Sequence, residues 1–137
     1  LRISLSFLKG LAFGLKGRII PVPTLESLNF PTKHNSSKHY IVMDSYRDKC
    51  FIQEFKGETA VNPPYLESTS YLVNIKEELY GYSESIKSSN KIIPSATLIG
   101  KYAIENKSNL MQENNDNINP IYLSDNEYVK IDDTGSK

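Results

Sequence analysis

The first seventeen residues, Leu1 to Gly17, constrain the fold of this chain more than any other stretch. At 100° per residue they form a helix with one apolar face that consists of Leu1, Leu5, Leu8, Ala12 and Leu15. A second face of apolar and small residues consists of Ile3, Phe7, Gly10 and Gly14. A helix on a single core needs an apolar stripe a little over 100° wide, and this arc is roughly twice that. One face can serve the chain's own core, and the other requires a partner helix, a membrane or a further part of the fold.

Composition narrows the class of protein. A length of 137 residues suits one compact domain, and sixteen basic against sixteen acidic side chains give no excess charge for nucleic-acid binding by the isolated chain. The single cysteine, Cys50, excludes an internal disulfide and indicates a reducing compartment, so we expect a cytoplasmic protein. Residue 1 already lies within the helical pattern without a capping residue, which predicts that the original chain extends upstream. Lys9, Lys16 and Arg18 interrupt the ~20-residue apolar run that a spanning helix needs.

The rest of the sequence alternates between helical and strand patterns. We expect strands at 39–44 and 49–55, joined by a four-residue turn at 45–48, with the first strand central because it is almost wholly apolar. In the second strand Cys50, Ile52 and Glu54 should face one side, and Phe51, Gln53 and Phe55 the other. Further expected elements are a strand at 18–23, a helix at 25–30 capped by Thr24, a loop at 56–68, a helix at 69–78, a strand at 79–81, a helix opened by Pro94-Ser95, a mobile loop at 106–119 and a strand at 120–123.

A set of motifs in this order resembles one family. The segment L-R-I-S-L-S-F-L-K-G-L-A, at 1–12, looks like the L-R-I-G-L-x-x-x-K-G-L-A helix of TsaB-type proteins, the glycoprotease-like accessory subunits of the bacterial machinery that makes threonylcarbamoyladenosine in tRNA. P-V-P-T-L-E-S-L at 21–28 and V-M-D-S-Y-R-D-K-C at 42–50 are similar to later family motifs, as are Pro94-Ser95-Ala96 and Pro120-Ile121-Tyr122-Leu123. Asp48, Lys49 and Ser124 depart from the family pattern, and the family's glycine-rich loop would lie upstream of Leu1.

The resemblance implies an α/β chain with the actin/Hsp70-type, ribonuclease-H-like fold, mainly its C-terminal lobe with one helix of the N-terminal lobe. Residues 1–17 would be the remnant helix of the N-terminal lobe, 18–131 the C-terminal lobe and 132–137 a disordered tail. In the family, helices of the N-terminal lobe pack against a TsaD-type catalytic subunit or a second copy. The interface residues that this implies are Leu1, Ile3, Leu5, Phe7, Leu8, Gly10, Leu11 and Gly14.

Residues that could carry chemistry have simpler interpretations. His34 and His39 are too far apart for a paired metal motif, and no third ligand is clustered beside them. Cys50 lies in an apolar strand, where a buried side chain is the expected role. Asp44, Arg47 and Asp48 sit at the hairpin turn, with turn stabilisation as the first interpretation and contacts at an inter-lobe cleft as the second. We therefore expect no catalytic, cofactor-binding or metal-binding residues.

The resulting hypothesis is a non-catalytic scaffold subunit for the threonylcarbamoyl modification of tRNA, which contacts tRNA only indirectly and no membrane. Its partner would be a TsaD-type subunit or a second copy, bound through the first helix. The alternative is a glycoprotease-type hydrolase, possibly inactive or truncated. A membrane-surface protein held by the first helix and a truncated relic without a role are further alternatives.

Overall fold

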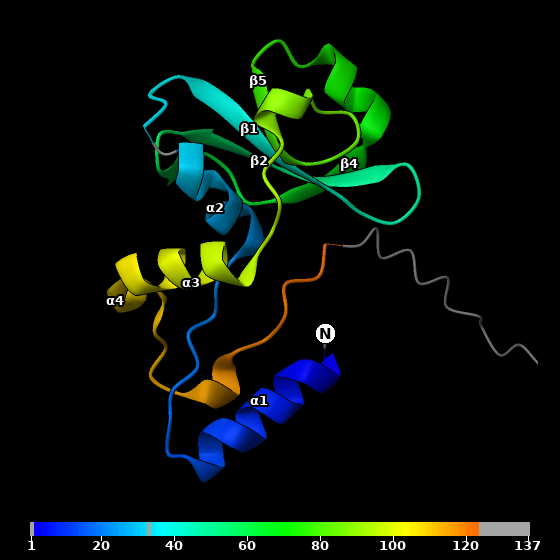
Figure 1. The fold of residues 1–137 in the computed structure, drawn as a ribbon. Helices are drawn as coiled ribbons and strands as arrows, with labels where there is room; N and C mark the ends of the chain where they lie inside the picture. Colours follow the sequence, from blue (N-terminus) through cyan, green and yellow to red (C-terminus); the bar gives the residue numbers. More distant parts are fainter. Residues whose placement is uncertain (1, 33, 124–137) are drawn as a thin grey trace, which may run out of the picture.

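A computed structural model describes residues 2–32 and 34–123, and the expected tail at 132–137 lies outside them together with Leu1. Figure 1 shows a sheet covered on one side by α2 and α3, with α1 set apart from the sheet at the end of an extended linker. The helices are α1 (Arg2–Gly14), α2 (Thr24–Asn29), α3 (Ala96–Glu105) and α4 (Lys107–Leu110). The short 3-10 helices are η1 (Phe30–Thr32), η2 (Thr69–Asn74), η3 (Ser88–Asn90) and η4 (Asn115–Asn117). The strands are β1 (Lys38–Asp44), β2 (Lys49–Lys56), β3 (Thr59–Ala60), β4 (Tyr65–Ser68) and β5 (Glu78–Tyr82).

Strand β1 lies inside the sheet, as its apolar sequence predicts. It pairs antiparallel with β2, from Lys38 opposite Lys56 to Asp44 opposite Cys50, and parallel with β5. The predicted turn at 45–48 closes this hairpin: the Ser45 amide donates to the Lys49 carbonyl at 2.9 Å, and Arg47 adopts a left-handed φ of 58°. The outer edge of β2 is shared by β4 and β3, which pair with its first and last residues respectively.

Two apolar clusters lie on opposite faces of the sheet. Alternation along β1 and β2 sends Ile41 and Phe55 toward α2, where they meet Leu25 and Leu28. The other face packs Tyr40, Val42, Cys50, Ile52, Leu72 and Ile86. The predicted alternation of β2 is confirmed. Each of the fully buried large side chains contributes ~1.5–3 kcal/mol through removal from water, so the hairpin and α2 form the most stable part of the fold.

Several predicted elements are wrong or incomplete. No strand forms at 18–23 or 120–123. Residues 18–23 connect α1 to α2, and residues 120–123 lead from η4 back toward the sheet without pairing with a strand (Figure 1). The predicted loop at 56–68 contains β3 and β4, since the free edge of β2 recruits both short segments. The predicted helix at 69–78 is the 3-10 helix η2, which ends where Ile75 becomes extended and leads into β5. The predicted mobile loop at 106–119 contains α4 and η4.

The ends of the helices are only partly as predicted. Ser95 caps α3 by accepting a hydrogen bond from the Leu98 amide at 3.2 Å, as Pro94-Ser95 indicates. Thr24 does not cap α2: the cap residue is Pro23, and the Thr24 carbonyl accepts from the Ser27 hydroxyl at 2.7 Å. Helix α1 ends in a Schellman-type turn in which Lys16, not Gly17, is left-handed, with a φ of 50°. The Gly17 amide donates to the Ala12 carbonyl at 2.8 Å and completes that turn.

Candidate interaction surface

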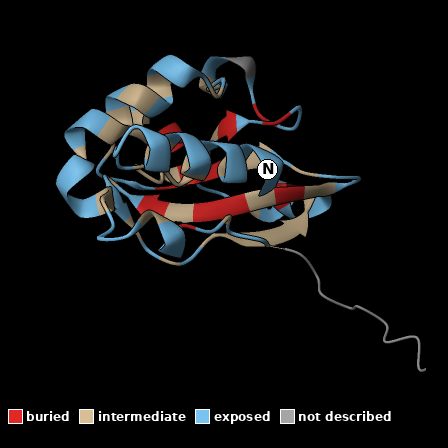
Figure 2. Ribbon diagram, turned by 90° about the horizontal axis from the view of Figure 1, so that it is seen from below, coloured by how far each residue is buried: buried red, intermediate tan, exposed pale blue. Residues whose placement is uncertain are grey.

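Helix α1 presents its apolar side chains to solvent. None of its described residues is buried, and Figure 2 shows it exposed along almost its whole length. The exposed fractions are 87% for Ile3, 70% for Phe7 and 88% for Phe13. Leu8 and Leu11 are about half exposed, at 46% and 48%. A surface helix of a monomeric domain ordinarily places such side chains against the core, so, within residues 2–32 and 34–123, this helix has an apolar face that packs against no other element.

The side of α1 that faces the rest of the molecule is partly polar. Lys9, Leu5 and Ala12 are the half-buried residues of this helix. The Lys9 ammonium donates to the Asp116 carbonyl at 3.0 Å, and the Arg2 guanidinium donates to the Tyr122 hydroxyl at 3.0 Å. The same guanidinium lies 5.1 Å from the centre of the Tyr122 ring. The inner side of α1 therefore combines the Lys9 side chain with Leu5 and Ala12, while Ile3, Phe7 and Phe13 are turned to solvent.

A groove separates α1 from the body of the fold. It encloses about 620 Å³ and is lined on one side by Leu5 and Leu8, and on the other by Pro21, Val22, Leu110 and Ile118. A second, mainly apolar cavity of about 400 Å³ adjoins it. Its walls are Leu25, Met43, Phe51, Pro64, Tyr122 and Leu123. Sequence reasoning missed this second cavity, because its walls come from five separate segments that no motif connects.

The structure places the predicted interface residues on different sides of α1. Ile3, Phe7 and Leu11 lie on the outward face, which we call the α1 outer face and define as Ile3, Phe7, Gly10, Leu11 and Gly14. Among the residues that the structure describes, nothing outside the helix lies within 4 Å of where a Cβ atom at Gly10 or Gly14 would be, so both positions are open to an approaching surface. Leu5 and Leu8 line the inner groove instead. Leu1 lies outside the described residues.

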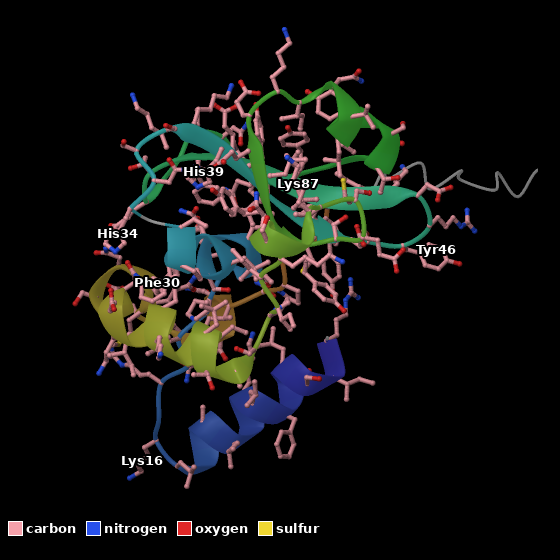
Figure 3. The ribbon with its side chains drawn as sticks, turned by 45° about the horizontal axis from the view of Figure 1, so that its top comes forward. Lys16, Phe30, His34, His39, Tyr46 and Lys87 are labelled. Carbon is pink, nitrogen blue, oxygen red and sulfur yellow. The ribbon has the colours of Figure 1, made fainter. Side chains whose placement is uncertain are left out.

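The two histidines occupy unlike surroundings (Figure 3). His34 is exposed, whereas His39 is fully buried between α2 and the sheet. The His39 ring contacts the Ser37 carbonyl through Nδ1 at 2.9 Å and the Asn29 amide oxygen through Nε2 at 2.7 Å. Among residues 2–32 and 34–123, no three His, Cys, Asp or Glu side chains gather into a group that could hold a metal.

The residues at the hairpin turn have structural contacts, through the side chains of Asp44 and Arg47 and through the backbone of Asp48. One Asp44 carboxylate oxygen accepts from the Glu84 amide at 3.0 Å, which ties the end of β1 to the segment after β5. The Arg47 guanidinium lies over the Tyr46 ring, 5.0 Å from its centre. The Asp48 carbonyl accepts from the Thr69 amide at 2.9 Å. These contacts fit turn stabilisation, and a role at an inter-lobe cleft stays a prediction.

A polar hollow of about 190 Å³ lies between α2 and α3. Glu26, Glu58, Tyr102 and Glu105 line it, and the Tyr102 hydroxyl donates to the Glu26 carboxylate at 2.7 Å. Burial and this hydrogen bond raise the pKa of Tyr102 above its ordinary value of 10.0. The hydroxyl therefore stays protonated across the physiological range and joins the two helices.

Cys50 is expected to resist thiol reagents. Its side chain is fully buried in the sheet, and burial, reinforced by the Asp44 and Glu67 carboxylates, raises its pKa from 9.0 to about 11. The attacking thiolate is thus scarce at pH 8, and its sulfur is out of reach. Labelling by a disulfide reagent at pH 8 should be slow in buffer and rapid in denaturant. Rapid labelling of the folded protein would contradict the buried placement of this thiol.

The same pKa shift has a direct consequence for stability. Because the thiol has a higher pKa folded than unfolded, the unfolded chain releases its proton first as the pH rises above 9. The free energy of unfolding should be unaffected by this group below pH 8 and should fall between pH 9 and 11. Cys50→Ser, which titrates nowhere in this range, should lose that part of the alkaline dependence.

The comparison with known proteins identifies the fold. No known protein family's sequence profile and no curated protein matches the chain. Two solved structures from Pseudomonas aeruginosa are similar to it, each at 16% identity. One is an uncharacterized protein with similarity to peptidase YeaZ, with a TM-score of 0.66 over 90% of this chain and 67% of that one. The other is YeaZ, with a TM-score of 0.63 over 88% and 67%. The chain therefore has the ribonuclease-H-like α/β fold of YeaZ proteins, and spans about two thirds of their length.

Proposed function

We propose that this chain is a non-catalytic, TsaB-type scaffold subunit that supports the enzyme forming threonylcarbamoyladenosine in tRNA. The observation that carries the proposal is the α1 outer face, an exposed apolar surface on a fold of the YeaZ type, which is the TsaB type. The ordered motifs of the sequence support the same assignment, because the first of them coincides with α1.

The α1 outer face has the chemistry of a protein-binding surface. Ile3 and Phe7 are one helical turn apart and nearly fully exposed, so both can insert into a single apolar groove. Burial of each would contribute ~1.5–3 kcal/mol from removal of apolar area from water. Gly10 and Gly14 continue the same face without side chains, so the partner's backbone could approach closely there.

The chemistry, in this proposal, is performed by a TsaD-type catalytic subunit, which handles the threonylcarbamoyl donor and the tRNA. The α1 outer face binds that subunit or a second copy of this chain. The formal net charge of zero supports an indirect relation to tRNA, because sixteen cationic and sixteen anionic side chains offer no overall attraction to phosphate. The role of this chain is to present α1 in a fixed orientation.

The double substitution Ile3→Asp and Phe7→Asp tests the docking surface. Two carboxylates in an apolar contact are costly to desolvate, so we expect at least a tenfold loss of affinity for a TsaD-type subunit, measured by co-purification and calorimetry. Sedimentation of the isolated chain measures self-association through the same face. The matched control is Val73→Asp, which changes an equally exposed residue, 87% accessible, on η2. Undiminished association of the double variant with both the TsaD-type subunit and itself would defeat the proposal.

The glycoprotease alternative stays a prediction. No contact among the described residues favours it, and the word peptidase enters only through the name of a similar structure. Separately, within the described residues no helix combines the length and the apolar content needed to cross a bilayer. Flotation with liposomes would distinguish the membrane-surface alternative from the scaffold role.

A further inference from the structure

We propose that Asn115, on η4, is the positioning residue that fixes the orientation of α1 and so the direction in which the α1 outer face points. Its side-chain amide forms two hydrogen bonds with the linker that follows α1. Asn115 Nδ2 donates to the Gly17 carbonyl at 3.0 Å, and Oδ1 accepts from the Ile19 amide at 2.9 Å. The amide thus bonds to one backbone carbonyl and one backbone N–H of the linker, as a peptide group of a neighbouring strand would in a sheet.

This pair of bonds matters because apolar packing does little to hold α1. The helix contains no buried residue, and a groove of about 620 Å³ lies between its inner side and the body. Two further polar contacts of α1 go to η4 and to the segment that follows it: Lys9 bonds to the Asp116 carbonyl, and Arg2 to the Tyr122 hydroxyl. Hydrogen bonds are directional, so a set of them fixes the rotation of a helix where loose apolar contact cannot.

Segment 114–118 is built to serve as a rigid support. Asn114 caps η4, its side-chain oxygen accepting from the Asp116 amide at 3.0 Å. Ile118 is 5% exposed and anchors the other end of the turn in the protein. Asn115 stands between these two fixed points and is half-buried. The amide orientation is determined by its partners, because a carbonyl faces Nδ2 and an N–H faces Oδ1.

Among the hydrogen bonds of residues 2–32 and 34–123, Asn115 is the only residue of segment 114–118 whose side chain bonds to both a backbone N–H and a backbone carbonyl of the linker after α1. The consequence for docking rests on the proposed function above: a pre-oriented helix avoids the entropy cost of ordering on binding. The geometric claim, that Asn115 orients α1, stands independently of any partner.

Hydrogen exchange and a distance measurement test the geometric claim. In Asn115→Ala, exchange of the Ile19 amide should be at least tenfold faster, since its acceptor is gone. Spin labels at Ser6→Cys on α1 and Lys101→Cys on α3 should give a broader distance distribution. Asn115→Asp keeps the acceptor for Ile19 and loses the donor to Gly17, so it should preserve Ile19 protection while broadening the distances less than alanine does. Asn119→Ala is the matched control, because that side chain bonds only locally, to the Asn117 carbonyl.

The outcomes separate the two proposals. Unchanged Ile19 exchange and an unchanged distance distribution in Asn115→Ala would overturn the role of Asn115. If both change while the association rate with the TsaD-type subunit falls about tenfold and the melting temperature stays fixed, both proposals are supported. A third outcome is that both change in Asn115→Ala, but the unmodified chain associates measurably with neither that subunit nor a second copy. In that case Asn115 still orients α1, and the scaffold function fails.

Discussion

Gly81→Ala will lower the free energy of unfolding by roughly 3–5 kcal/mol, because two independent penalties meet at one residue. Gly81 lies on β5 opposite Val42 of β1 and has a φ of 122°, which side-chain-bearing residues rarely adopt. A Cβ atom there would lie 2.1 Å from the Val42 carbonyl oxygen, far inside contact distance. Neither strand can shift cheaply, since Gly81 also accepts a 2.7 Å hydrogen bond from the Ile92 amide and pairs with Lys91.

Equilibrium denaturation by urea measures this change, with Gly100→Ala as the matched control. Gly100 lies within α3, and nothing outside its own helix is within 4 Å of the added methyl group. The same substitution should therefore stabilise the protein there, by about 0.5–1 kcal/mol from helix propensity. A Gly81→Ala variant as stable as the unmodified protein would show that β5 does not approach β1 in this way.

His39→Leu should cost roughly 2–4 kcal/mol, although leucine is more apolar than histidine and the site is fully buried. Each ring nitrogen lies within hydrogen-bonding distance of an oxygen atom, Nδ1 at 2.9 Å from the Ser37 carbonyl and Nε2 at 2.7 Å from the Asn29 amide oxygen. Asn29 Nδ2 donates to the Gly57 carbonyl at 2.9 Å, and the Thr32 hydroxyl donates to Asn29 Oδ1 at 2.8 Å, so this amide keeps both of those bonds when the ring is removed. Leucine leaves the Ser37 carbonyl without its contact to Nδ1 and removes the ring that stacks on Phe55 and meets the edge of Tyr80.

The midpoint of thermal unfolding, followed by circular dichroism, checks this second prediction. His34→Leu is the matched control, because His34 is exposed and its replacement should change stability by less than about 0.5 kcal/mol. If both substitutions lowered the stability equally, the buried contacts of His39 would contribute no more to stability than the exposed side chain of His34.

The sequence was most informative where a local pattern and its burial agree. Alternation in β2 and the apolar run of β1 predicted both strands, their turn and the side-chain faces of β2, because a strand buried on both faces admits few other patterns. Ser95 predicted the start of α3 for a similarly local reason. The ordered motifs predicted the YeaZ-type fold that the structural comparison confirms, although identity is only 16%.

The missed features depend on contacts between distant segments. Strands β3 and β4 form because the edge of β2 is free, which nothing in residues 59–68 indicates. The Asn-rich segment after α4 has the composition of a loop, and its order comes from hydrogen bonds to the linker after α1. For the candidate site, helical geometry predicted two faces of apolar residues on α1. Which of them turns outward depends on contacts with distant residues, those of Lys9 and Arg2 with residues 116 and 122 and those of the linker after α1 with Asn115.

The pairing of β1 with strands on its two sides sets an order for folding. Contact between β1 and β2 needs only a four-residue turn, whereas contact between His39 and Glu78 must wait until the chain between them has closed a long loop. We therefore expect the hairpin to belong to the folding transition state and the parallel seam with β5 to form after it. A destabilising substitution at the β1–β5 pairing should therefore raise the unfolding rate and leave the refolding rate nearly unchanged. Such a variant would still fold, but each folded molecule would have a shorter lifetime.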